Sequence, residues 1–236
     1  MIRPKILVIV PARKGSKGIP SKNKKELLGK PLVSYTFDVA SKLHENFFTY
    51  VSSDDNEIIK IAEDYNIKNN GLRPGNISDD EALTIDVLHY ELLATEKKLQ
   101  VQFDAVMLLQ PTCPIRNISH IYDVEKLFVK NEMNSSVVSV KKIDSEHPFR
   151  MKRMVQDHIL VNYIDQGYED MRPRQALPPV YIRNGSVYLT PAVHIRNKET
   201  LVTNTAFGYL MDTVHSINID NIEDFLVASH FMEAKD

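Results

Sequence analysis

The stretch ILVIVPARKGSKGIPSKNKK (Ile6–Lys25) joins an apolar run to a loop with six cations, two glycines and no acid. The run Ile6–Val10 has the length and the branched residues of a buried strand. A loop that leaves the carboxyl end of the first strand of an open α/β sheet lies where such sheets bind ligands. The stretch therefore predicts an α/β fold with an anion-binding loop after its first strand.

The loop has the features of a polyphosphate site. Gly15 and Gly18 let backbone N–H groups approach phosphate oxygens, and the lysine and arginine side chains neutralise their charge. The cations repel one another, and an anionic ligand relieves that repulsion. The spacing matches neither the Walker A motif nor the dinucleotide fingerprint. Taken alone, the loop leaves a solvated basic turn as the alternative.

Composition limits the class of protein. With 236 residues and 43% hydrophobic content, the chain suits one α/β domain with an excursion. A net charge of −2 argues against a nucleic-acid binder, whose positive charge spreads over a face. Cys113 is the single cysteine, so the cytoplasm is the expected compartment. The N-terminal apolar run is too short for a signal segment, and we expect no membrane partner.

Short apolar runs alternate with helical patterns, which predicts a mainly parallel sheet covered by helices. Strands are expected at Lys5–Pro11, Phe47–Ser53, Phe103–Gln110 and Ser136–Lys141. Helices are expected at Pro31–Leu43, Asp55–Tyr65, Asp79–Lys98, Asn117–Lys130 and, at the end of the chain, Asn221–Ala234. The segments GSVYLT, FGYLM and VHSINID between residues 185 and 220 return to regular patterning.

The segment from about residue 144 to 177 loses this regularity. It mixes charges with repeated Met, Ile, Val and Tyr residues. A disordered loop is the alternative, but this apolar content indicates a folded excursion that needs a surface to pack against. We expect a dimerisation insertion within one domain that covers residues 1–236.

Two further stretches place polar residues next to expected strand ends or turns. LLQPTCPIR (Leu108–Arg116) carries Gln110 on a turn bracketed by prolines, and GLRPGNISDD (Gly71–Asp80) carries Arg73 just before a helix. Either stretch alone is compatible with a simple turn. Their position predicts that they join the basic loop at one end of the sheet.

SINIDNIEDF (Ser216–Phe225) is a candidate cation site. If it is a strand, Asn218 and Asp220 point the same way because they are two residues apart. Their oxygens suit Mg²⁺, which also takes waters and ligand phosphates. The alternative is that Asp220 caps the helix that follows.

Assembled in this order, the chain resembles the N-acylneuraminate cytidylyltransferases, or CMP-sialic acid synthetases. The matching blocks are PARKGSKGIPSKN, LRPGNISDDEALT, LLQPTCPIR, SVVSV, EHPFR, PRQALP, NGSVY and SINIDNIEDF. The resemblance implies a Rossmann-like nucleotidyltransferase core, a homodimer built by an inserted lobe, and Mg²⁺ dependence. The implied reaction joins CTP to an acidic nine-carbon sugar, a nonulosonic acid, giving the CMP-sugar and pyrophosphate.

The resemblance also implies roles for individual residues. For the nucleotide these are Arg13, Ser16, Lys17, Lys22, Asn23, Arg73 and Thr84, and for the sugar Gln110, Arg150, Arg174 and Tyr188. Asp220 and Asn218 match the metal positions, and Arg13, Lys17, Lys22 and Asp220 match the catalytic set.

Two departures from the family pattern bear on the metal site and on the sugar. Asn218 stands where the family commonly has a first aspartate, which removes one negative charge from the metal site. Where a sialic acid enzyme of the family has FRPNG, this chain has YIRNG (Tyr181–Gly185), so the arginine stands one residue later. On a strand, a shift of one residue moves a side chain to the opposite face. We therefore expect Arg183 to point away from the pocket. The nonulosonic acid is left open between N-acetylneuraminic, legionaminic and others.

Three alternatives stay open at this stage. One is a cytidylyltransferase for another sugar acid such as Kdo. Another is a non-catalytic nucleotide-binding module, and the third is a structural partner protein with a basic patch and no affinity for CTP.

Overall fold

The computed structural model describes residues 3–143 and 145–234. Its strands are β1 (Ile6–Pro11), β2 (Glu26–Leu27), β3 (Lys30–Pro31), β4 (Phe47–Ser52), β5 (Lys68–Asn69), β6 (Ala105–Leu109), β7 (Val137–Ile143), β8 (Lys152–Met154), β9 (Leu160–Asn162), β10 (Val180–Pro191) and β11 (Phe207–Leu210). Its α-helices are α1 (Leu32–Ala40), α2 (Asn56–Asp64), α3 (Thr84–Leu99), α4 (Ile118–Lys130), α5 (Ala192–Arg196) and α6 (Ile222–Glu233). Short 3-10 helices lie at Lys22–Lys24, Gly75–Ile77, Pro148–Arg150, Gln156–His158 and Arg174–Ala176.

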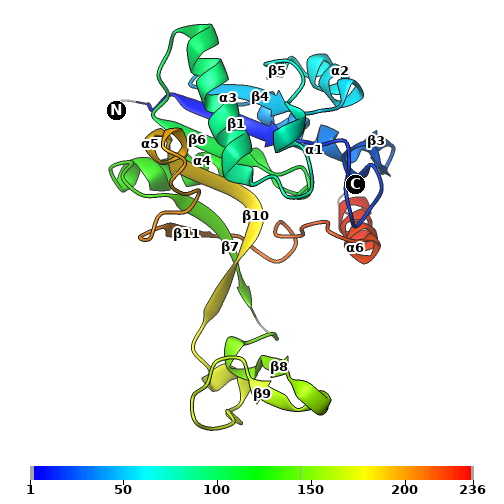
Figure 1. The fold of residues 1–236 in the computed structure, drawn as a ribbon, viewed down its shortest axis with the longest axis vertical. Coiled ribbons are helices and arrows are strands. Elements are labelled where there is room, and N and C mark those ends of the chain that lie inside the picture. The colour runs from blue at the N-terminus through cyan, green and yellow to red at the C-terminus, as the bar shows by residue number, and fades with distance from the viewer. Residues whose placement is uncertain (1–2, 144, 235–236) are drawn as a thin grey trace.

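The central sheet has seven strands in the order β11-β7-β10-β6-β1-β4-β5 (Figure 1). β1 pairs in parallel with β4 and β6, and β7 pairs in parallel with β11. β10 runs antiparallel to both of its neighbours, β6 and β7. The expected mainly parallel sheet is confirmed, with β10 as the strand that departs from it.

Helices cover both faces of this sheet. The alternating residues Ile6, Val8 and Val10 of β1 join one hydrophobic cluster with α1, α2 and α4. Leu7 and Ile9 join a second cluster, on the face of α3 and α5. A strand buried on both faces reads as a continuous apolar run, which is why the sequence identified β1 so clearly.

The predicted elements match the observed ones closely, with two exceptions. Helix α3 was expected to start at Asp79 but begins at Thr84. Residues 217–219 of VHSINID were expected to be extended in a strand but have no regular secondary structure. Helices α2, α4 and α6 begin where predicted, because Asp55, Asn117 and Asn221 each accept a hydrogen bond from a backbone N–H of the first turn.

A lobe of residues 145–177 stands apart from the core. The antiparallel pair β7–β10 carries it, with Val180 opposite Ile143 at the far end, and the small β8–β9 sheet lies inside it (Figure 1). Asp144, where the insertion was expected to begin, lies outside the described residues.

None of the helices in the described part of the chain has the length and apolar character needed to span a membrane.

Candidate functional site

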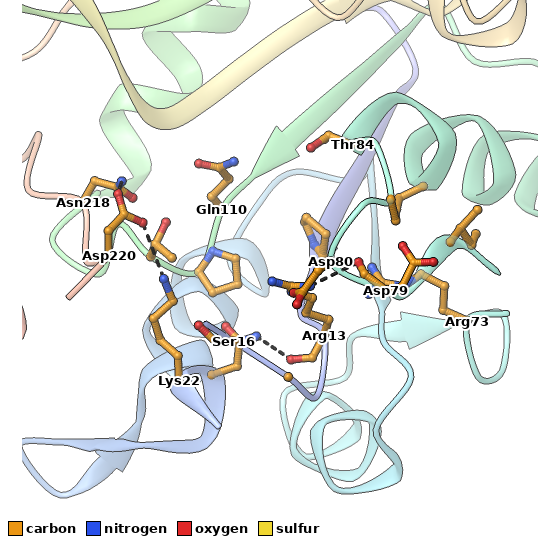
Figure 2. Close-up of a pocket in the computed structure, with 18 residues that line it drawn as sticks. Arg13, Ser16, Lys22, Arg73, Asp79, Asp80, Thr84, Gln110, Asn218 and Asp220 are labelled. Carbon is orange, nitrogen blue, oxygen red and sulfur yellow. Dashed lines mark hydrogen bonds and ion pairs between the residues drawn. The ribbon is translucent and has the colours of Figure 1, made fainter. Parts of the chain in front are cut away.

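A cavity of about 460 Å³ opens at the carboxyl ends of β1 and β6 (Figure 2). The sheet order reverses between these two strands, since β1 continues through α1 to β4 on one side while β6 starts the other half. Ligands of open α/β sheets bind at this switch point. The cavity is lined by Pro11, Arg13, Gly15, Ser16, Lys22, Asn23, Arg73, Ile77, Asp79, Asp80, Ala82, Thr84, Val87, Gln110, Pro111, Thr112, Asn218 and Asp220.

The basic loop after β1 folds back on itself at the cavity. The buried Asn23 side chain donates to the Arg13 carbonyl at 2.9 Å, which joins the two ends of the loop. The backbone N–H of Lys14 donates to Asp54 at 2.8 Å. Gly18 is packed tightly, because a Cβ there would lie 2.1 Å from the Asp220 carbonyl oxygen. The loop is therefore held in one shape by backbone contacts.

Acids from other segments neutralise part of the loop, which corrects the expectation of cations with no carboxylate nearby. Asp80 lies 2.5 Å from Arg13 and 3.6 Å from Lys17. The hydrogen bond from Arg13 holds the pKa of Asp80 below its usual value. Lys24, by contrast, pairs with Asp55 at 2.8 Å and does not line the cavity. Asp80 thus lies against the cations expected to bind phosphate.

Lys22, Asn218 and Asp220 form the opposite wall of the cavity (Figure 2). Lys22 Nζ donates to the Ile219 carbonyl at 2.8 Å and lies 3.5 Å from Asp220. Asn218 donates to Asp220 at 2.7 Å, so the two side chains meet as expected, although no strand carries them. The alternative role for Asp220 is wrong, because Asn221 is the N-cap of α6. The Asp220 carboxylate thus faces the cavity.

Arg73 lies in the segment before α3, and Thr84 is the first residue of that helix. The Arg73 side chain is buried, and its Nε donates to Ser78 at 3.0 Å. Burial lowers the pKa of Arg73, and the nearby Asp54 carboxylate at 3.8 Å partly offsets this decrease.

Arg13 also contacts the segment before α3. The Asp79 carbonyl accepts a hydrogen bond from the Arg13 side chain at 3.1 Å. This contact and the Arg13–Asp80 pair hold residues 79–83 over the cavity, which explains why α3 begins five residues later than expected.

Gln110 lies at the end of β6, where its side chain reaches β10. A Cβ on Gly185 would lie 2.6 Å from Gln110 Oε1, and Gly185 has a φ of +79°. The buried Arg116 side chain donates to the Gln110 carbonyl at 3.3 Å, to the Ser186 carbonyl at 2.6 Å and to the Thr36 hydroxyl at 2.8 Å. These contacts join β6, β10 and α1 under the cavity. Burial lowers the pKa of Arg116 to about 10.

Cys113 is a structural residue of the same turn. It is buried, and its Sγ lies 3.4 Å from the Asn184 carbonyl and 3.6 Å from Asn218 Oδ1. Burial raises the pKa of the Cys113 thiol to about 11, so the thiolate needed for a nucleophile is disfavoured.

The structure brings most of the predicted site residues together and separates four from the cavity wall. Lining the cavity are Arg13, Ser16, Lys22, Asn23, Arg73, Thr84, Gln110, Asn218 and Asp220. Lys17 is exposed beside Asp80, and Tyr188 is buried on the sheet opposite Leu108. Arg150 and Arg174 lie in the lobe, and they are not part of the cavity wall of their own chain.

The strand register corrects the reasoning behind the expectation for Arg183, although Arg183 does not line the cavity. Arg183 lies opposite Val140 and Tyr188 lies opposite Val138, with a register shift between them. Since Val138 and Val140 share one face of β7, Arg183 and Tyr188 also share a face. From Arg183 to Tyr188 the strand β10 advances five residues against two on β7, so the bulge around Gly185 adds three residues, an odd number that reverses the alternation and cancels the one-residue slip. Sequence reasoning also missed Asp80, because the acidic stretch before α3 resembled a helix first turn.

A mainly parallel sheet with a basic loop at its switch point is an arrangement found in α/β nucleotide-binding proteins. The cytidylyltransferase family matches residues 7–233 of the chain. The CMP-N,N'-diacetyllegionaminic acid synthase of Legionella pneumophila is 31% identical, with 97% of each chain covered. The pseudaminic acid cytidylyltransferase of Campylobacter jejuni is 32% identical, with 93% of each covered. This chain belongs to the cytidylyltransferase family.

The N-acylneuraminate cytidylyltransferase of Escherichia coli is 29% identical over 99% of this chain and 54% of its own length. The chain thus spans about half the length of that relative. Among solved structures, a CMP:2-keto-3-deoxy-manno-octonic acid synthetase complexed with CTP has a TM-score of 0.69 at 14% identity, covering 98% of this chain and 100% of that one. At this identity, the likeness supports the fold alone.

Proposed function

We propose that the chain transfers CMP from CTP to the anomeric hydroxyl of a nonulosonic acid and releases pyrophosphate. The observation that carries the proposal is the cavity at the switch point, where Arg13 and Lys22 of the basic loop face Gln110 across the carboxyl ends of β1 and β6. The relatives named for neuraminic, legionaminic and pseudaminic acids support the substrate class. Kdo has weaker support, since its synthetase shares only 14% identity.

The residues of the cavity account for the chemistry through charge and alignment. Nucleotidyl transfer needs little covalent help from a protein, and positioning with charge neutralisation supplies most of the rate. In this proposal Arg13, Lys17 and Lys22 bind the triphosphate and stabilise the charge that develops on the departing pyrophosphate. Gln110 binds the sugar. Thr84 and Arg73 line the end of the cavity that takes the nucleotide.

The Asp220 carboxylate and the Asn218 amide are the oxygen donors proposed to hold Mg²⁺. Among the described residues no cluster of three or more His, Cys, Asp or Glu side chains could hold a metal by itself. Mg²⁺ is commonly held by one or two carboxylates together with substrate phosphates, and this donor set fits that pattern. When bound, Mg²⁺ would neutralise phosphate charge.

The Asn218→Asp variant tests this metal site. The added carboxylate should raise the apparent Mg²⁺ affinity of the CTP complex about tenfold, because the ligand set gains one charge. Calorimetric titration of CTP binding at a series of Mg²⁺ concentrations measures this without turnover. No shift between variant and parent would exclude Asn218 from the metal site.

The lobe is proposed to form a homodimer. Its apolar side chains are exposed, with Met171 at 82%, Met154 at 65% and Tyr163 at 64%. No residue of 145–177 belongs to the three hydrophobic clusters of the described chain. Large exposed apolar patches mark interaction surfaces, and a second copy presents the same patch in return. In this proposal the partner lobe brings Arg150 and Arg174 to the sugar, since neither residue lines the cavity of its own chain.

The test is pyrophosphate release with CTP, Mg²⁺ and a panel of N-acetylneuraminic, legionaminic and pseudaminic acids and Kdo. The proposal expects turnover of at least one nonulosonic acid and little or none of Kdo. CTP binding without turnover of any sugar would indicate a nucleotide-binding module instead. No CTP binding would favour a structural protein. The cytoplasm, where CTP is made, remains the proposed location.

A further inference from the structure

Arg183 lies on the same face of the sheet as Tyr188, and a second set of contacts supports this placement independently of the register. Asn184 accepts a hydrogen bond from the Ser139 hydroxyl at 2.6 Å. Ser139 lies between Val138 and Val140 on β7, so its side chain is on the opposite face from theirs. Because neighbouring strand residues alternate, Arg183 faces the side that Asn184 does not.

This face continues from the cavity. Tyr188 lies opposite Leu108, and Gln110 follows Leu108 by two residues. The Gln110 side chain reaches Gly185, because its Oε1 lies only 2.6 Å from the point that a Cβ on Gly185 would occupy. Arg183 is two residues beyond Gly185 on the same strand. The positive charge of Arg183 also offsets part of the rise that burial causes in the pKa of Tyr188. Arg183 thus lies on the part of β10 that continues from the Gln110 contact at Gly185.

The charges around the cavity differ between its two ends. At the phosphate end, Arg13 and Lys22 are already near Asp80 and Asp220. Arg183 is exposed, and it has no ion pair with any acid in the described part of the chain. An exposed guanidinium beyond Gln110 is placed to receive an anion at the sugar end. Guanidinium groups match carboxylates with two parallel hydrogen bonds.

We propose that Arg183 binds the carboxylate of the sugar acid and selects acidic over neutral sugars. The inference rests on the proposed function, because it names the group that recognises the substrate of that reaction. It assigns the role to a residue brought to this face by the bulge at Gly185 and not by its position in a regular strand.

The experiment measures sugar and CTP kinetics of Arg183→Ala with the best nonulosonic acid of the panel. The KM for the sugar should rise about 10- to 100-fold, as expected for loss of a charged hydrogen-bonding partner, with the KM for CTP unchanged. Arg183→Lys should recover part of the loss, since it keeps the charge but not the fork. Ile182→Ala is the matched control, because Ile182 lies opposite Lys141 on the other face.

The methyl ester of the same sugar identifies the group that Arg183 contacts. With the carboxylate neutralised, Arg183→Ala and the parent should bind the ester equally well in competition with the free acid. An unchanged sugar KM in Arg183→Ala, or an equal loss of affinity for acid and ester, would overturn the inference while leaving the reaction intact. If the parent turns over no sugar of the panel, the proposed function itself fails.

Discussion

The core and the lobe of this chain are built in opposite ways. The core buries both faces of its sheet under helices, and its apolar residues form hydrophobic clusters with their own chain. The lobe is a two-stranded sheet with short 3-10 helices whose large apolar side chains are mostly exposed. The core therefore covers its own apolar residues and forms the cavity, while the lobe leaves large apolar side chains exposed, as interaction surfaces do.

Lys22→Ala should give the largest effect and shows whether the chemistry lies in the core. Lys22 contacts both the Ile219 carbonyl and Asp220 across the cavity. Loss of a preorganised cation should lower kcat about 10²- to 10³-fold, by analogy with donors to a developing oxyanion. The melting temperature should stay close to that of the parent. Lys25→Ala, which removes a loop cation that does not line the cavity, is the control, and an unchanged rate for Lys22→Ala would remove Lys22 from the mechanism.

Tyr163→Asp tests whether the exposed apolar side chains of the lobe form the dimer interface. A charge within the proposed apolar interface should weaken self-association about 30-fold or more, as loss of a binding hot spot does. Sedimentation over a range of concentrations measures it. CTP affinity should be unchanged because the cavity is in the core. Lys130→Asp on the core surface is the control, and a dimer that survives Tyr163→Asp intact would place the interface elsewhere.

Dimers of two different variants test whether the lobe of one subunit completes the site of the other. A Lys22→Ala chain and an Arg174→Ala chain should each be nearly inactive. When subunits exchange at random, half of the dimers contain one of each, and one of their two sites has an intact core and an intact partner lobe. Activity should therefore return to about a quarter of the parent value. No recovery after exchange would mean that each site uses its own lobe.

Gly185→Ala should give a smaller effect, confined to the sugar. Alanine at the φ of +79° is strained, and its Cβ would meet the Gln110 side chain. Displacing Gln110 should raise the sugar KM about tenfold. The CTP KM should not change. Gly75→Ala, where a Cβ meets open space, is the control, and a rise in both KM values for Gly185→Ala would show a general distortion of the site.

Asp80→Asn should give the smallest effect and in the opposite direction. Removing the carboxylate frees Arg13 and Lys17 for phosphate, so the CTP KM should fall about two- to fivefold, as for an exposed ion pair. Because Arg13 keeps the pKa of Asp80 below its usual value, Asp80 stays charged above about pH 5, and the difference should be constant from about pH 6 to 8. A higher CTP KM in the variant would mean that Asp80 helps to bind the nucleotide.

The sequence predicted the core well, because its signals are local. The apolar run of β1 and the N-caps Asp55, Asn117 and Asn221 depend on residues a few positions away. Asn218 and Asp220 were expected to meet, and they do, although a loop brings them together. The basic loop was placed correctly at the switch point because β1 determines where it begins.

The remainder depends on contacts between distant residues. The start of α3 was missed because Asp80 pairs with Arg13, 67 positions away, and does not join the helix. The face of Arg183 was missed because a bulge changes the alternation, and only the register against β7 reveals it. The lobe carries no periodic pattern, so its sequence predicted that its apolar residues need a surface to pack against but not which of them are exposed.

The most direct test of the account follows the phosphorus atoms of CTP. CTP labelled at the α-phosphate or at the γ-phosphate is incubated with the full chain, Mg²⁺ and the nonulosonic acids of the panel. We expect the α label to appear in a sugar nucleotide and the γ label in pyrophosphate. Transfer of the γ label to the sugar, or no labelled sugar with any acid while CTP is bound, would contradict it.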